Sequence, residues 1–219
     1  MTTTAEFLRD IAGHRMHVVR DDGLHRQLWF GRPGSSCMHF QLITWPGYLC
    51  YTGDMGTFVF RRLEDMLQFF RREAGERQYR IDFRYWAEKV EAADKSDGIT
   101  EFSAAKFDRA VKEYTLQWIR DHREETTREE RRDLWTEVTD RVINPDDDDI
   151  RGHRKTMAAY DFSHQVNRAC RFRFEDFVSE RSFSEYTQRF LWCCHAIAWA
   201  IGVYDDAKEA KKATEGAAA

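Results

Sequence analysis

The chain has 219 residues, with 34 lysines and arginines against 38 aspartates and glutamates, which gives a formal net charge of −4. Hydrophobic residues make up 42% of the chain and aromatic residues 14%, enough to form a folded core rather than a disordered tail. The longest apolar run, residues 190–204, is shorter than the roughly 18 residues of a membrane span, and no apolar leader is visible. We therefore expect neither a membrane protein nor a secreted one.

The cysteines support the same expectation. An odd number of cysteines without a CxxC pair indicates reduced thiols inside a cell rather than a disulfide scaffold. They are Cys37, Cys50, Cys170, Cys193 and Cys194.

Residues 1–75 predict an antiparallel sheet. After a short helix over residues 4–13, the apolar period changes to two, which is typical of strands with one buried face. Trp45-Pro46-Gly47-Tyr48 fits a type II turn, because proline fixes the second position and glycine accepts the positive φ of the third. A helix over residues 63–70 closes this region. The expected strands, about five, cover residues 16–20, 25–30, 37–45, 48–52 and 57–60.

Residues 76–206 predict a helical region, and residues 207–219 a frayed tail. Ser103 is a candidate N-cap, and Thr127 with Glu130 forms a capping box. Ser182 and Glu185 repeat that pattern before the longest helix, at about residues 183–205. Because this helix is apolar on every face, we expect it to be buried at the centre of a bundle, with Leu191, Ile197 and Trp199 inside. The predicted fold class is α+β, an N-terminal antiparallel sheet followed by a helical bundle.

Several catalytic motifs are absent from the sequence. It contains no GxxxxGK[ST] loop, no GxGxxG after a strand, no HExxH and no GxSxG. We therefore expect no cofactor, no metal and no catalytic residue.

The sharpest charge feature is a run of four carboxylates, Asp146, Asp147, Asp148 and Asp149, after Asn144-Pro145. The favoured interpretation is a helix start, where proline and aspartate suit the first turn. The run also fits contact with a partner, by imitating a nucleic-acid backbone, or a magnesium site.

Two groups of histidines and cysteines suggest chemistry, but a structural role is the stronger interpretation of each. Cys193-Cys194-His195 resembles a thiol nucleophile beside its base, yet it lies in a helix that is apolar all round, which favours core packing. His17, His25 and His39 lie on neighbouring predicted strands and are a weak candidate metal site.

The best candidates for contact with a partner lie around the predicted turns. Trp45 and Tyr48 flank the Pro-Gly turn, where rigid aromatic side chains are either displayed to a partner or buried. Asp54 lies in the following turn. Arg61 and Arg62 belong to the best basic patch, together with Arg71 and Arg72. Elsewhere the basic and acidic residues alternate, which together with a pI near 6.1 argues against direct nucleic-acid binding.

The sequence resembles a family of uncharacterised proteins carried by bacteriophages and prophages. The likeness covers about residues 28–205. It is carried by LITWPG (42–47), GDMGT (53–57), DMLQFFR (65–71), YWAEKV (85–90) and LWCCHAIAW (191–199). That family has no assigned reaction, so the resemblance implies no catalytic residue. It implies a phage origin and action in the cytoplasm of an infected bacterium.

Accessory phage proteins are often anti-defence factors, and anti-CRISPR proteins are among them. The leading hypothesis is therefore a non-enzymatic inhibitor that binds protein subunits of a bacterial defence complex, most plausibly a CRISPR effector. One alternative is a metal-dependent enzyme acting on nucleic acid or nucleotides, with the aspartate run or the strand histidines holding the metal. A further alternative is an interaction module of phage DNA metabolism.

Overall fold

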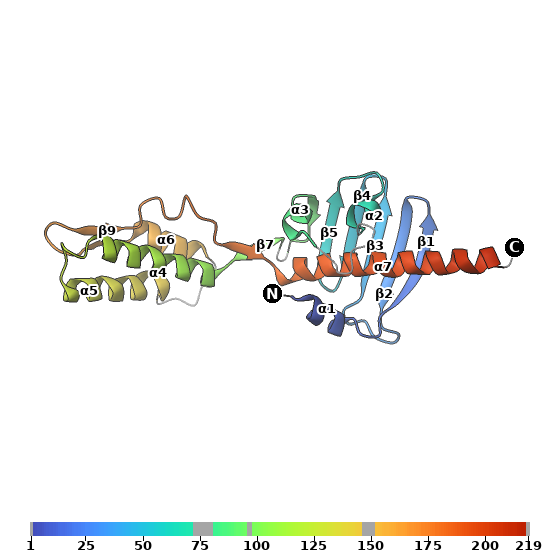
Figure 1. Ribbon diagram of the computed structural model, residues 1–219, viewed down its shortest axis with the longest axis horizontal. Helices are drawn as coiled ribbons and strands as arrows, with labels where there is room; N and C mark the ends of the chain where they lie inside the picture. Colours follow the sequence, from blue (N-terminus) through green and yellow to red (C-terminus); the bar gives the residue numbers. More distant parts are fainter. Residues whose placement is uncertain (1, 72–80, 96–97, 146–151, 218–219) are drawn as a thin grey trace. The chain divides into compact units, whose positions relative to one another are not determined.

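The computed structural model describes residues 2–71, 81–95, 98–145 and 152–217, and it divides the chain into two compact units. The first unit contains residues 1–100 and 186–219, and the second contains residues 101–185. The second unit is therefore a segment inserted into the first (Figure 1). This division differs from the expected one at residue 75, because the last helix belongs to the same unit as the sheet. The fold class, α+β, is as predicted.

The first unit is built on a six-stranded antiparallel sheet with its strands in sequence order. The five predicted strands are present, and a sixth follows much later in the chain. This sixth strand was not predicted, because four residues of the sequence VEAA show no clear alternation. The strands are β1 (Arg15–Asp22), β2 (His25–Gly31), β3 (Phe40–Trp45), β4 (Tyr48–Gly53), β5 (Gly56–Arg61) and β6 (Val90–Ala93).

One face of the sheet forms the core with four helices, α1 (Thr4–Asp10), α2 (Met66–Phe70), α3 (Phe83–Ala87) and α7 (Gln188–Ala217). Figure 1 shows α7 running across the sheet. Phe40 stacks on Tyr51 and meets the ring of Trp192 edge-on, with a centroid separation of 5.7 Å. The indole Nε1–H of Trp192 donates to Asp10 at the end of α1, which satisfies its buried polar atom.

The long helix α7 differs from the prediction at both ends. It continues to Ala217, through most of the tail that was expected to fray, and it also starts later than expected. It begins at Gln188, and the hydroxyl of Thr187 accepts a hydrogen bond from the Phe190 amide. The expected capping pair, Ser182 and Glu185, lies upstream, at a point where residues 184–186 form strand β10 (Ser184–Tyr186). Leu191 and Ile197 are buried as predicted, whereas Trp199 is only partly buried at the rim of the core.

The second unit has its own aromatic core, which includes Phe107, Phe172 and Phe177. Ser103 caps α4, and Thr127 with Glu130 forms the predicted capping box of α5. The region is not purely helical, since it also contains short strands. These strands were not predicted, because three residues are too few to show a period. Its elements are β7 (Thr100–Phe102), which pairs with β10, α4 (Ala104–Asp121), α5 (Arg128–Val138), the π-helix η1 (Thr139–Ile143), α6 (His153–Asp161), β8 (Ser163–Gln165) and β9 (Arg171–Arg173). Among the described residues of both units, none of the helices has the length and apolarity that crossing a membrane requires.

Candidate functional site

The sheet has a second face, which we call the open face: the side chains of β1–β5 that alternate away from α7. On β3, β4 and β5 every inward residue except Gly53 and Gly56 is buried, and every outward residue keeps some exposure to solvent. The strand register arranges these outward residues in rows across the sheet. The rows are His17, Trp29, Gln41, Thr52 and Thr57; then Gln27, Ile43, Cys50 and Val59; and finally Trp45, Tyr48 and Arg61.

The last row brings three of the sequence-predicted candidates together, and we call it the turn cluster. Trp45 and Tyr48 are cross-strand partners, and their rings stack with 5.2 Å between centroids and 16° between planes. The guanidinium carbon of Arg61 lies 5.3 Å from the centroid of the Tyr48 ring. Both aromatic residues are half-buried and Arg61 is exposed, so the turn cluster is ordered and accessible at once. The sequence left open whether these two aromatic side chains are displayed or buried. In the structure each ring is partly covered and partly exposed to solvent.

The turn beneath this cluster is fixed by hydrogen bonds. Gly47 has φ of 84°, as the predicted turn requires, and its amide donates to the Glu64 carbonyl at 2.9 Å. The hydroxyl of Thr44 donates to the Leu24 carbonyl at 2.8 Å, which ties the end of β3 to the β1–β2 hairpin. These two hydrogen bonds restrain the backbone of the turn that carries Trp45 and Tyr48.

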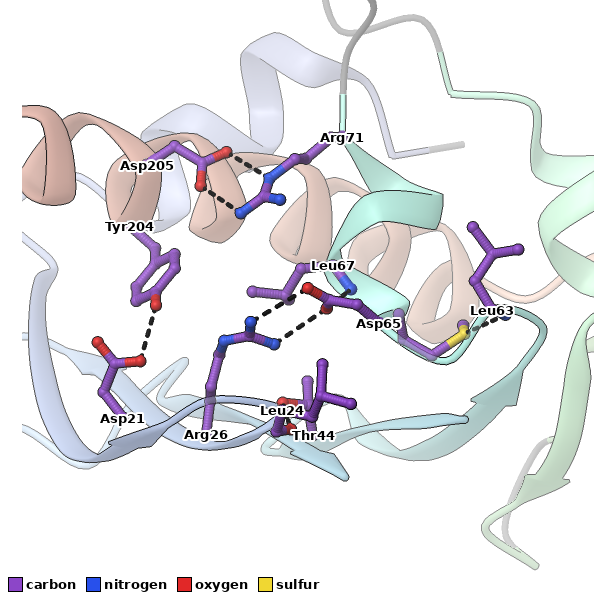
Figure 2. Close-up of polar contacts among 11 residues, drawn as sticks. Asp21, Leu24, Arg26, Thr44, Leu63, Asp65, Leu67, Arg71, Tyr204 and Asp205 are labelled. Atoms are coloured by element: carbon purple, nitrogen blue, oxygen red, sulfur yellow. Dashed lines mark hydrogen bonds and ion pairs between the residues drawn. The ribbon is translucent and has the colours of Figure 1, made fainter. Parts of the chain in front are cut away.

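The segment that supports the turn is held by a partly buried ion pair (Figure 2). Arg26 donates through Nη1 and Nη2 to the two carboxylate oxygens of Asp65, at 3.0 and 3.1 Å. The same carboxylate accepts the Leu67 amide and caps α2. A bidentate pair with a guanidinium that is 11% exposed has far less freedom than a surface salt bridge. Asp65 therefore fastens the segment after β5 to β2.

Further ion pairs surround a cavity of about 570 Å³ between the β1–β2 hairpin and α7. Arg71 donates to both carboxylate oxygens of Asp205, at 2.9 and 2.8 Å. Lys208 and the Tyr204 hydroxyl both donate to Asp21, and Figure 2 shows the second of these bonds. The hydrogen bond from Lys208, followed by that from Tyr204, lowers the pKa of the Asp21 carboxyl. Because these charges pair with one another, we assign the cavity lining a role in docking α7.

The other sequence-predicted candidates do not join the turn cluster. Asp54 lies at the far end of β4, where its carboxylate is 3.0 Å from Nδ1 of His39. Arg62 is exposed, directly after the end of β5. The four aspartates at residues 146–149 and Arg72 lie outside the described residues.

The Cys-Cys-His sequence of α7 is part of the core, as its apolar surroundings predicted. Cys193 and Cys194 are fully buried, and loss of solvation raises the pKa of both thiols well above the ordinary value. A thiolate nucleophile is therefore disfavoured at this position. Burial also lowers the pKa of His195, whose ring stacks on Phe7 at 5.7 Å.

The strand histidines lie apart in the sheet register. His17 is opposite Trp29, His25 is opposite Asp22, and His39 pairs with Asp54. Within the described part of the chain, no three His, Cys, Asp or Glu side chains are grouped so as to hold a metal ion.

Trp29 is a candidate that the sequence analysis missed. It alternates with buried Leu28 and Phe30 in the segment 25–31, so its outward direction was readable from the period-two pattern. Its ring rests on the backbone at Gly31, at a place that a Cβ atom of residue 31 would occupy.

Comparison with known proteins identifies no relative. No family model matches the chain, and neither a curated protein nor a solved structure matches it. The functional argument therefore rests on the residues of this chain.

Proposed function

We propose that this protein acts by occupancy: it binds protein subunits of a bacterial defence complex, such as a CRISPR effector, and inhibits the complex without a catalytic step. The observation that supports binding is the turn cluster, in which Trp45, Tyr48 and Arg61 stack at the accessible end of the sheet. The choice of a defence complex rests on the resemblance to phage accessory proteins.

The composition and rigidity of the turn cluster suit a protein contact. Tryptophan, tyrosine and arginine are the residue types that dominate the binding energy of protein interfaces. Side chains that already stack before binding lose less conformational entropy when a partner covers them. The hydrogen bond from Gly47 to Glu64 adds to this by holding the turn in one conformation.

The proposal is tested by affinity capture with the tagged full chain in a bacterium that carries an active CRISPR system. The lysate is treated with nuclease, so that capture through nucleic acid is removed, and the bound proteins are identified by mass spectrometry. We expect effector subunits with the wild type and loss of them with the Trp45→Ala/Arg61→Ala double variant. Arg84→Ala, which removes an exposed arginine of α3, is the control and should capture as the wild type does.

Inhibition should also be stoichiometric, should survive EDTA and should leave the target covalently unmodified. Turnover of many target molecules by one inhibitor, or loss of inhibition on chelation, would favour the metal-dependent enzyme instead. Capture of replication proteins in place of effector subunits would favour a module of phage DNA metabolism.

A further inference from the structure

The overall charge of the chain conceals an uneven distribution. The first unit contains 18 basic and 18 acidic residues, so the net charge of −4 belongs to the second unit. On the open face, the register of β1–β5 places three arginines, Arg15, Arg20 and Arg61, and one carboxylate, Asp22. That carboxylate pairs with Arg20 at 3.0 Å. The open face is therefore cationic, although the pI of the chain is near 6.1.

The same face displays flat aromatic surfaces and hydrogen-bonding groups. Trp29 lies at one part of the face and the stacked Trp45 and Tyr48 at another. Because Trp29 pairs with Gln41, four residues before Trp45 on β3, the two indoles are separated by roughly 13 Å along the strand at about 3.3 Å per residue.

Polar side chains lie between and beside these rings. Gln27 donates to Gln41 at 2.8 Å, and the hydroxyls of Thr52 and Thr57 are 2.9 Å apart. Amide and hydroxyl groups of this kind can exchange such mutual bonds for bonds to base edges.

From this combination we infer that the open face binds single-stranded nucleic acid, with bases stacked on Trp29 and on the turn cluster and phosphates near Arg15 and Arg61. Unpaired bases offer their faces to aromatic side chains, and sheet surfaces of this size stack two or three of them. A duplex keeps its bases stacked inside, so it cannot use these rings. This activity goes beyond the proposed protein contact and does not depend on it.

The test is a titration of the purified full chain into fluorescently labelled oligonucleotides, followed by anisotropy. The probes are a single-stranded DNA and a single-stranded RNA of the same mixed sequence, and the corresponding DNA duplex. We expect both single strands, or one of them, to bind more tightly than the duplex, and the affinity to fall as salt rises. The comparison between DNA and RNA identifies which strand the face prefers.

Two variants test the aromatic contact. Trp29→Ala should weaken binding by about 5- to 150-fold, as expected for the loss of stacking by one base. Gly31→Ala keeps the indole but places a methyl group where the ring now rests, so it should also weaken binding. If Trp29→Ala does not fold, Trp29→Phe retains an aromatic surface and should bind with an intermediate affinity.

The charge contact is tested separately. Arg15→Ala, at an exposed position of an edge strand, should lower the slope of log affinity against log salt by about 0.7. Arg84→Ala on α3 is the matched control and should leave both affinity and slope unchanged.

Three outcomes would overturn the inference: no binding of either single strand, wild-type affinity in both Trp29→Ala and Arg15→Ala, or equal displacement of the strand by poly-L-glutamate at the same charge concentration. The last result would identify a surface for acidic polypeptides. Since the capture experiment above uses nuclease-treated lysate, its outcome is independent of this one.

Discussion

Trp45 and Tyr48 stack ring on ring across the two-residue turn between β3 and β4, with 5.2 Å between their centroids. They are the last cross-strand pair before the turn, and only Pro46 and Gly47 separate them in the chain. The pair is therefore held from both sides, by the ladder of β3 and β4 and by the Gly47–Glu64 hydrogen bond. An aromatic surface of this kind is a property of the folded turn and does not need a partner to form.

The first prediction concerns that turn. Gly47→Ala should lower the free energy of unfolding by about 1–2 kcal/mol, because φ of 84° is unfavourable for a residue with a Cβ atom. Denaturant unfolding measures the change. Gly216→Ala is the control, since Gly216 lies near the end of α7 without a positive φ and with open space around its Cα, and its unfolding midpoint should stay close to that of the wild type or rise.

The second prediction compares two tryptophans of α7. Trp192 is 1% exposed and contacts both the sheet and α1, so Trp192→Ala should cost about 3–5 kcal/mol. Trp199 is only partly buried, so Trp199→Ala should cost less, about 1–3 kcal/mol. Tyr160, which is 74% exposed on α6, provides a control whose alanine variant should unfold as the wild type does. Equal losses at Trp192 and Trp199 would contradict the position of α7 on the sheet.

The third prediction concerns acid. Hydrogen bonds from Lys208 and Tyr204 lower the pKa of Asp21 below its value in the unfolded chain, so Asp21 stabilises the fold above the unfolded pKa of about 3.8. That stabilisation should disappear as the pH falls from about 4 through the lower pKa of the folded state. Asp21→Asn should be less stable than the wild type at pH 7 and should lose less stability between pH 5 and pH 2.

The stabilities of the wild type and of Asp21→Asn are compared by thermal unfolding at a series of pH values between 7 and 2. Asp206→Asn, at an exposed position of α7, should show the acid dependence of the wild type. A variant at Asp21 that follows the wild-type curve at every pH would show that its bonds to α7 do not contribute to stability.

The fourth prediction concerns the thiols. Cys37 is exposed, whereas Cys170, Cys193 and Cys194 are buried, and burial raises the pKa of the last two. A disulfide reagent at pH 8 should therefore modify Cys37 rapidly in the native protein, Cys50 more slowly, and the three buried thiols only after denaturant is added. Cys37→Ser should remove the fast phase. Fast reaction of Cys193 or Cys194 in the native protein would contradict their burial and would favour a thiol nucleophile at this position.

The sheet was predictable because its signals are local. Alternation along β3 and the Pro46–Gly47 turn both lie within a few residues, and the same holds for the capping pair Thr127 and Glu130. The division into units was not predictable from the sequence, because α7 packs on a sheet whose fifth strand ends more than a hundred residues earlier. No local pattern records which distant segment covers a given apolar face.

The candidate site was predictable in part for the same reason. Trp45 and Tyr48 flank one turn, so their proximity was readable, whereas the addition of Arg61 depends on the register between β4 and β5. The cationic character of the open face was hidden, because residues as distant as Arg15 and Arg61 share it only after the sheet has formed.

Because the second unit is inserted between β6 and α7, the ribosome synthesises the sheet well before the helix α7 that packs on it. The apolar inner face of the sheet, with Phe30, Phe40 and Tyr51, is complete when β6 emerges, but α7, the longest of the four helices that cover it, follows only after the second unit. At about 5–20 residues per second, the intervening chain delays that cover by roughly 5–20 s. During this interval the nascent sheet exposes an aromatic surface, so a chaperone that shields it should raise the yield of native protein.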